Sequence, residues 1–351
     1  MDRIIVSTGY MGSGSSAITD LVAEFKNCEN EFKSYEYVLL HSPNGLFDLE
    51  DKLLLGNNAI RSDEAIRTFY DQMKKLYNKK FWWIGNYEKV IGHNFMKITN
   101  DYINSLINFN YDSYWYTHEE VNIKMFLKLC IRKPFKVLSL NKLKFKKVLK
   151  YNDGMKICLP TKEEFYNKSK KYINDIIGEI SKGKKNVILD QLLLPFNLHR
   201  IDNYFDDRLK VIVVERDPRD VFILNKYIWK EKQCGVPMPL DVLEFCKYYK
   251  RMRESEIKAN SNKILRISFE DLIYNYEKKL EEIKKFLNFS DEDHINKKTR
   301  FNPEISIKNT QLFNNKKYKR EISVIEKELK KYLYNFPYEL SNDVRETIEF
   351  E

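Results

Sequence analysis

The five cysteines of this 351-residue chain form no pair at the spacing that metal and redox sites use. None stands in a C-x-x-C arrangement, so neither a zinc ribbon nor a dithiol redox centre is indicated. Their odd number and wide spacing predict reduced thiols in a cytoplasmic protein. No cluster of His, Asp and Glu at ligand spacing is present either, so we expect no bound metal.

Long apolar runs are also missing, and no segment approaches the length that spans a bilayer. Met1-Asp2-Arg3 leads directly into the first predicted strand, which leaves no room for a signal peptide. We therefore expect no transmembrane segment and a cytoplasmic location. Basic residues, in contrast, are in excess. The net charge of +10 favours an anionic ligand or surface, including peripheral contact with a membrane. A lysine-rich composition without any such partner is the simpler alternative.

Glycine is scarce, with 11 in the whole chain, yet Gly9, Gly12 and Gly14 stand within six residues. They follow the β-branched run Ile4–Val6 and precede apolar residues at helical spacing between positions 17 and 22. A strand, a glycine-rich turn and a helix in this order gather backbone N–H groups into a cradle for phosphate. The candidate anion-binding residues are Gly12, Ser13, Gly14, Ser15 and Ser16. A turn that only starts a helix is the alternative.

This loop differs from the phosphate loop of nucleoside triphosphatases at one position. The pattern G-x-x-x-x-G-K-[ST] fits Gly9 to Ser16, except that Ser15 stands in place of lysine. Without that lysine, the loop cannot clamp the β- and γ-phosphates of a triphosphate in the usual way. A P-loop kinase, with Asp190 as its Mg²⁺ ligand, is therefore an alternative and not the first hypothesis.

Apolar runs along the chain predict further strands at 35–40, 187–190, 209–214 and 264–267, with helices between them. This alternation predicts an α/β fold, a parallel sheet flanked by helices, with the phosphate-binding loop after the first strand. We expect a single domain over residues 1–351, with a helical, aromatic and basic insertion at about 81–160. The basic run 142–150 within it is more typical of a solvated helix than of a binding site.

A second anion site is indicated where the strand at 209–214 ends. The run Glu215-Arg216-Asp217-Pro218-Arg219-Asp220 places Arg216 at the carboxyl end of that strand, where α/β folds bind their ligands. The planar fork of arginine donors suits a phosphate group. A structural ion pair between Arg216 and a neighbouring carboxylate is the alternative.

With these two motifs the chain resembles the sulfotransferases that use 3′-phosphoadenylyl sulfate (PAPS). In that family a loop near the amino terminus holds the 5′-phosphosulfate, and an R-[DN]-P-x-D type run holds the 3′-phosphate. The run Lys263–Leu272, followed by Phe286-Leu287, resembles the family's strand ending in Y-E-D-L, with Phe269 for tyrosine. Ser306-Ile307-Lys308-Asn309 and the basic stretch through Lys317 resemble its cofactor-covering loop. The resemblance reaches about half of the chain and leaves about 52–185 unmatched.

Three departures from the family pattern concern the chemistry. Gly12 stands where many sulfotransferases carry Lys or Arg, and Leu224, beside the polar Asn225, stands where they often have serine. Asp190-Gln191 stands where several carbohydrate sulfotransferases carry lysine. The resemblance thus implies cofactor contacts at Arg216, Asn225, Lys308 and Asn309, but it leaves the cation beside the transferring sulfuryl group unassigned.

The resemblance implies an enzyme that moves a sulfuryl group from PAPS to a hydroxyl or amine of a carbohydrate or small metabolite. No nucleic acid partner is expected, and the oligomeric state stays open. A glutamate serves as base in the related carbohydrate enzymes at the position that Glu36 matches, so Glu36 is the candidate catalytic base, with His41 and His93 as alternatives. A non-catalytic nucleotide- or anion-binding protein of the same fold is a further alternative.

Overall fold

The computed structural model describes residues 1–28, 35–81, 83–111, 115, 123–139, 154–229, 238–259 and 261–340. The predicted basic run 142–150 lies outside them. The strands are β1 (Arg3–Gly9), β2 (Lys80–Phe81), β3 (Ile84–Gly85), β4 (Phe109–Tyr111), β5 (Met155–Ile157), β6 (Asn186–Ile188), β7 (Leu209–Glu215) and β8 (Ile264–Ser268). The principal helices are α1 (Ser16–Val22), α2 (Leu46–Leu54), α3 (Ala59–Asn78), α5 (Phe95–Leu106), α6 (Ile123–Leu138), α7 (Lys162–Ser181), α9 (Pro218–Ile223), α10 (Val242–Glu254), α12 (Tyr276–Leu287) and α14 (Lys319–Glu328).

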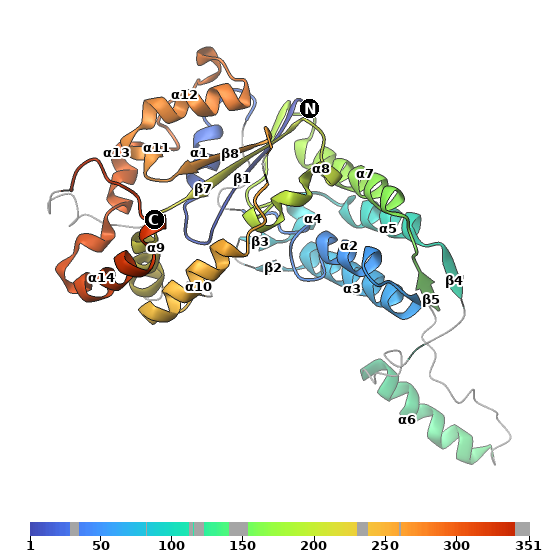
Figure 1. Ribbon diagram of the computed structural model, residues 1–351. Coiled ribbons are helices and arrows are strands. Elements are labelled where there is room, and N and C mark those ends of the chain that lie inside the picture. The colour runs from blue at the N-terminus through green and yellow to red at the C-terminus, as the bar shows by residue number, and fades with distance from the viewer. Residues whose placement is uncertain are drawn as a thin grey trace.

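The central sheet is parallel throughout, in the order β6-β1-β7-β8. Helices flank it on both sides, so the predicted α/β class is confirmed (Figure 1). Four of the five predicted strands are present. The carboxyl ends of parallel strands meet at one edge of a sheet, so the segments that follow β6, β1, β7 and β8 lie together there.

Period-two alternation divides the strand side chains between two apolar cores. In β1, Ile4 and Val6 pack into the core that α2, α3, α5 and α7 cover, whereas Ile5 packs into the core beneath α1 and α12. In β7, Val211 and Val213 face the first core and Ile212 faces the second. Both faces of these strands are buried, as a sheet covered by helices on both sides requires.

The predicted strand at 35–40 is wrong. Its backbone makes single bonds to two different segments, from the N–H of Glu36 to the carbonyl of Trp83 (3.0 Å) and from Tyr37 to Asp190 (2.9 Å). No ladder forms, because the chain then turns at once toward α2, with the N–H of Ser42 bonded to the carbonyl of Val38. The apolar run is buried by this turn and not by sheet pairing.

Residues 81–160 contain more than the helices that we expected. Within the described part of this range, α5 and α6 occur together with the antiparallel pairs β2–β3 and β4–β5. The extent of the insertion and the single domain stay predictions. No helix in the described ranges has the length and apolar character that a membrane span requires.

Candidate functional site

The glycine-rich loop after β1 is shaped by contacts that leave no space for side chains. Gly12 and Gly14 have φ angles of +80° and +82°, in the region that favours glycine. A Cβ atom would lie 3.1 Å from the ring of Trp229 at Gly12 and 2.9 Å from the ring of Phe269 at Gly14. The two glycines therefore let aromatic rings pack directly on the loop backbone.

The loop keeps a set of unused donors. The N–H of Ser13 donates to the carbonyl of Tyr10 (2.8 Å), but none of the hydrogen bonds among the described residues uses the N–H groups of Gly12, Gly14, Ser15 or Ser16. The hydroxyl of Ser13 is buried and also has no partner in the described part of the chain. Buried polar groups are almost always paired. The loop thus fits an anion that accepts several hydrogen bonds at once.

Arg216 lies beside this loop because β1 and β7 are neighbours, with Gly9 opposite Val214. Its guanidinium donates to the carbonyl of Gly12 (3.3 Å) and to the carbonyl of Asn309. It also stacks over the ring of Phe269, 4.7 Å from the centroid. Arg216 therefore bridges the phosphate loop and the carboxyl-terminal loop, and it brings a positive charge to Gly12, where the loop lacks its own cation.

One donor of Arg216 is still free. The residue is only 8% exposed, yet its Nε has no partner among the described residues, and no ion pair is formed there with a carboxylate. Burial lowers the pKa of Arg216, whereas the nearby carboxylates, Asp220 first, raise it. A buried arginine whose hydrogen bonds to the described residues all go to backbone carbonyls remains available to a further anionic partner.

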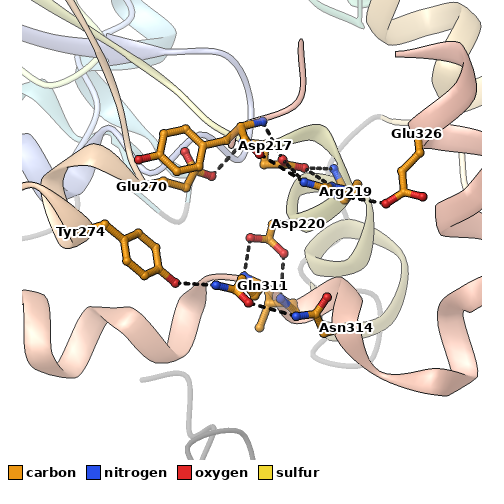
Figure 2. A network of polar contacts seen from close by, with 10 residues as sticks. Asp217, Arg219, Asp220, Glu270, Tyr274, Gln311, Asn314 and Glu326 are labelled. Carbon is orange, nitrogen blue, oxygen red and sulfur yellow. Dashed lines mark hydrogen bonds and ion pairs between the residues drawn. The ribbon is translucent and has the colours of Figure 1, made fainter. Parts of the chain in front are cut away.

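A polar network holds the carboxyl-terminal loop against α9 (Figure 2). The carboxylate of Asp220 accepts the backbone N–H groups of Gln311 (2.9 Å) and Leu312 (2.8 Å), and the Gln311 amide donates to the hydroxyl of Tyr274 (3.0 Å). Burial raises the pKa of Asp220 to about 7. The short 3-10 helix η5 (Ile307–Asn309), which carries Lys308, is fixed next to the end of β7 by these bonds.

The second part of the network joins α9 to its neighbours. Arg219 donates to both oxygens of Asp217 (3.0 and 2.8 Å) and to Glu326 of α14 (2.9 Å), as Figure 2 shows. Glu270, which follows β8, accepts the backbone N–H of Asp217 (2.9 Å), and burial raises its pKa to about 8. Arg219 is thus fully committed to structural pairs, in contrast to Arg216.

On the other side of the loop, Gln191 fixes the phosphate loop to the end of β6. Its Nε2 donates to the hydroxyl of Ser15 (2.8 Å), and its Oε1 accepts the hydroxyl of Thr8 (3.1 Å). The neighbouring Asp190 accepts a hydrogen bond from the hydroxyl of Ser7 (3.1 Å) on β1. Asp190 and Gln191 thus join the end of β6 to β1 and to the glycine-rich loop.

Glu36 lies next to this pair, since its chain neighbour Tyr37 bonds the backbone of Asp190. Burial raises the pKa of Glu36, and a hydrogen bond with the Trp83 side chain lowers it in part. Burial, and secondly the charge of Glu36, raise the pKa of Asp190 to about 7. Two desolvated carboxyls thus lie together at the end of β6, and each holds its proton at a higher pH than an exposed carboxyl.

The two alternative bases lie in different surroundings. The Nε2 of His41 lies 2.7 Å from the carbonyl of Gln191, and burial lowers the pKa of its imidazole. His41 therefore belongs to the same group as Glu36 and Asp190. His93 has an exposed side chain whose Nδ1 lies 3.2 Å from Glu88.

The other predicted site residues lie in three different segments. Asn225 lies in the π-helical stretch η3 (Leu224–Trp229), with its Nδ2 3.4 Å from the carbonyl of Met238 and its Oδ1 buried without a partner in the described ranges. Lys308 is half-buried beside Asn309, and Ser16 is exposed at the start of α1. Their roles in binding stay predictions. The sequence did not predict that Phe269, Trp229 and Gln191 contact the loop, because no local pattern indicates these contacts.

Comparison with known proteins bears on the carboxyl-terminal half. The family model described as "Sulfotransferase domain" matches residues 192–335, which include β7, Arg216, β8 and η5 but not the loop at 9–16. The predicted resemblance to the sulfotransferase family is confirmed. The sulfotransferase match covers less than half of the chain. It supports sulfuryl transfer in general.

Solved sulfotransferase structures resemble the chain only distantly. The sulfotransferase domain from the curacin biosynthetic pathway is 12% identical, with 99% of this chain and 96% of that chain covered and a TM-score of 0.39. The sulfotransferase domain from the Synechococcus PCC 7002 olefin synthase is 11% identical, with 98% and 91% covered and a TM-score of 0.35. No curated protein matches the chain.

The burial of Asp190 makes a prediction about stability and pH. Its pKa is about 7 in the folded protein against 3.8 for a free side chain, so between these values the folded state binds more protons than the unfolded state. Stability from this group is therefore present at low pH and lost as the pH rises toward 7. As the pH rises from 4 to 8, we expect the free energy of unfolding of wild type to fall relative to that of Asp190→Asn. The expected difference is on the order of 3 kcal/mol.

The measurement is urea unfolding of both proteins at several pH values in that range. Asp175→Asn, at a carboxylate on α7 that pairs with Lys171, is the matched control and should follow the wild-type curve. Parallel curves for wild type and Asp190→Asn would show that Asp190 is ionised in the folded protein without penalty.

Proposed function

We propose that the protein transfers a sulfuryl group from PAPS to a hydroxyl or amine of an acceptor, a carbohydrate or a small metabolite. One observation carries the choice of donor: free backbone donors after β1 and an arginine with a free Nε after β7 lie on adjacent strands. Two anion-binding features at neighbouring strand ends suit a nucleotide with phosphates at two positions. The family match supports the transfer chemistry.

The unpaired polar atoms fit this donor. The N–H groups and the Ser13 hydroxyl would take the 5′-phosphate, and Arg216, with Asn225 and Lys308 nearby, would take the 3′-phosphate. Bound PAPS supplies a sulfuryl group on a phosphate leaving group. No lysine at Ser15 is needed, because no γ-phosphate has to be held.

Three groups of the chain would each have one role in the transfer. Glu36 would accept the proton of the acceptor's hydroxyl or amine, while the acceptor's oxygen or nitrogen bonds to sulfur and the bond from sulfur to the phosphate oxygen breaks. The loop N–H groups stabilise the charge that develops on that phosphate, as preorganised donors do at an oxyanion. Arg216 adds a positive charge at Gly12, against whose carbonyl it lies. Burial raises the pKa of Glu36 toward neutrality, which suits a base.

The experiment for this function is transfer from labelled PAPS to a panel of sugars and phenols, followed by Glu36→Gln on the best acceptor. Gln is nearly isosteric but cannot take the proton, so we expect the turnover to fall by roughly 10²–10⁴-fold with the affinity for the product nucleotide unchanged. Glu88→Gln, at an exposed carboxylate, is the control and should keep the wild-type rate.

A near-normal rate in Glu36→Gln would exclude this base and direct attention to His41. No transfer by wild type across a broad panel, with nucleotide binding intact, would instead favour the non-catalytic binding protein.

The role of Arg216 can be tested by binding. Because Arg216 also bridges two loops, Arg216→Lys is preferable to alanine, since it retains the charge and removes the fork of donors. We expect the affinity for adenosine 3′,5′-bisphosphate to fall by about 1.5–3 kcal/mol, the usual value of a charge-assisted hydrogen bond. Calorimetric titration measures it, with Arg251→Lys on the exposed face of α10 as control. Unchanged affinity in a folded Arg216→Lys protein would remove Arg216 from the 3′-phosphate site.

A further inference from the structure

Helix α6 (Ile123–Leu138) exposes a continuous apolar stripe. Eight of its exposed residues recur at intervals of three and four, the spacing of one face of a helix, and Val137 is exposed outside this stripe. The exposed fraction reaches 81% at Ile123, 59% at Phe126 and 57% at Phe135. The members of the stripe are Ile123, Phe126, Leu127, Cys130, Ile131, Pro134, Phe135 and Leu138. So many large apolar side chains in contact with water on one helix mark an interaction surface.

The sequence of the same helix is strongly basic. Its sixteen residues include five Lys or Arg and no Asp or Glu: Lys124, Lys128, Arg132, Lys133 and Lys136. An apolar stripe on a helix whose charged residues are all basic is typical of helices that lie in the plane of a lipid surface. The helix therefore combines apolar and electrostatic attraction to one kind of partner.

The position of α6 leaves the stripe accessible. Figure 1 draws the helix beyond the β4–β5 pair, on the side away from the central sheet. It contributes no residue to the phosphate loop or to the site at Arg216. The surface and the nucleotide site are thus separate parts of the molecule.

We propose that α6 is a membrane-surface helix, which binds anionic lipid with its apolar stripe in the boundary between headgroups and acyl chains. A second copy of the chain fits this surface less well. Two such helices would bring five positive charges against five, in a protein whose net charge is already +10. An anionic bilayer supplies both an apolar layer and the complementary charge.

Co-flotation of the full-length protein with vesicles tests the proposal. We expect binding to vesicles of phosphatidylcholine with phosphatidylglycerol to exceed binding to phosphatidylcholine alone by about tenfold or more, and to weaken in about 0.5 M salt. The variant Phe126→Ser, Ile131→Ser, Phe135→Ser should lose binding to the anionic vesicles. The control Leu243→Ser, Ile257→Ser, Ile305→Ser removes apolar side chains that are 52%, 59% and 65% exposed elsewhere and should bind as wild type.

Four results would overturn the proposal: equal binding to neutral and anionic vesicles, no binding to either, wild-type binding by the α6 variant, or equal loss in the control. Sedimentation of the same proteins without lipid tests the alternative partner, a second copy of the chain. A concentration-dependent dimer that only the α6 variant abolishes would assign the stripe to a second copy. Melting temperatures near that of wild type confirm that both variants fold.

Discussion

The parallel pairing of β1 with β7 is the constraint on which the site depends. With Gly9 opposite Val214, the chain leaves both strands at the same edge of the sheet, separated by about one strand spacing of ~5 Å. A loop of free N–H groups and a buried arginine are therefore neighbours. The same pairing rule adds Asp190 and Gln191 from the end of β6, and Phe269 and Glu270 from the end of β8.

Burying this many charged groups at one edge costs free energy, and the structure offsets the cost with backbone hydrogen bonds. Asp220 and Glu270 accept backbone N–H groups, and Arg216 donates to backbone carbonyls. The carboxyl-terminal loop is therefore a component of the site and not an addition to it. Burial raises the pKa values of Asp220 and Glu270, so these carboxyls hold their protons at a higher pH than exposed carboxyls do.

Local patterns in the sequence predicted the elements whose signal is local. Alternation in β1 and β7, the glycines of the loop and the arginine after a buried strand all follow from a few adjacent residues. The prediction of a strand at 35–40 was wrong because a turn into α2 buries its apolar run. In the sequence, an apolar run buried by a turn has the same pattern as one buried in a sheet. Phe269 packs on Gly14, and Gln191 donates a hydrogen bond to Ser15. Both contacts join residues far apart in the chain, so they could not be predicted from local sequence patterns.

The catalytic and binding roles of individual residues do not follow from the fold. The contacts place Glu36 beside Asp190, but its role as the base stays a prediction, as do the roles of Asn225 and Lys308 and the single domain. What the fold adds to the proposed nucleotide is position: the loop after β1 and Arg216 after β7 lie at a spacing set by the sheet.

The most direct measurement of this claim compares the affinities of adenosine 3′,5′-bisphosphate, adenosine 5′-monophosphate and ATP with Mg²⁺ for the wild-type protein, by calorimetry and thermal shift. If both features bind phosphate, the bisphosphate binds most tightly, and at a hundredfold its Kd it stabilises the fold by about 2.7 kcal/mol. The 5′-monophosphate should bind at least tenfold more weakly, and ATP should add little. Equal affinity for the two adenosine phosphates, or tighter binding of ATP, would contradict the account.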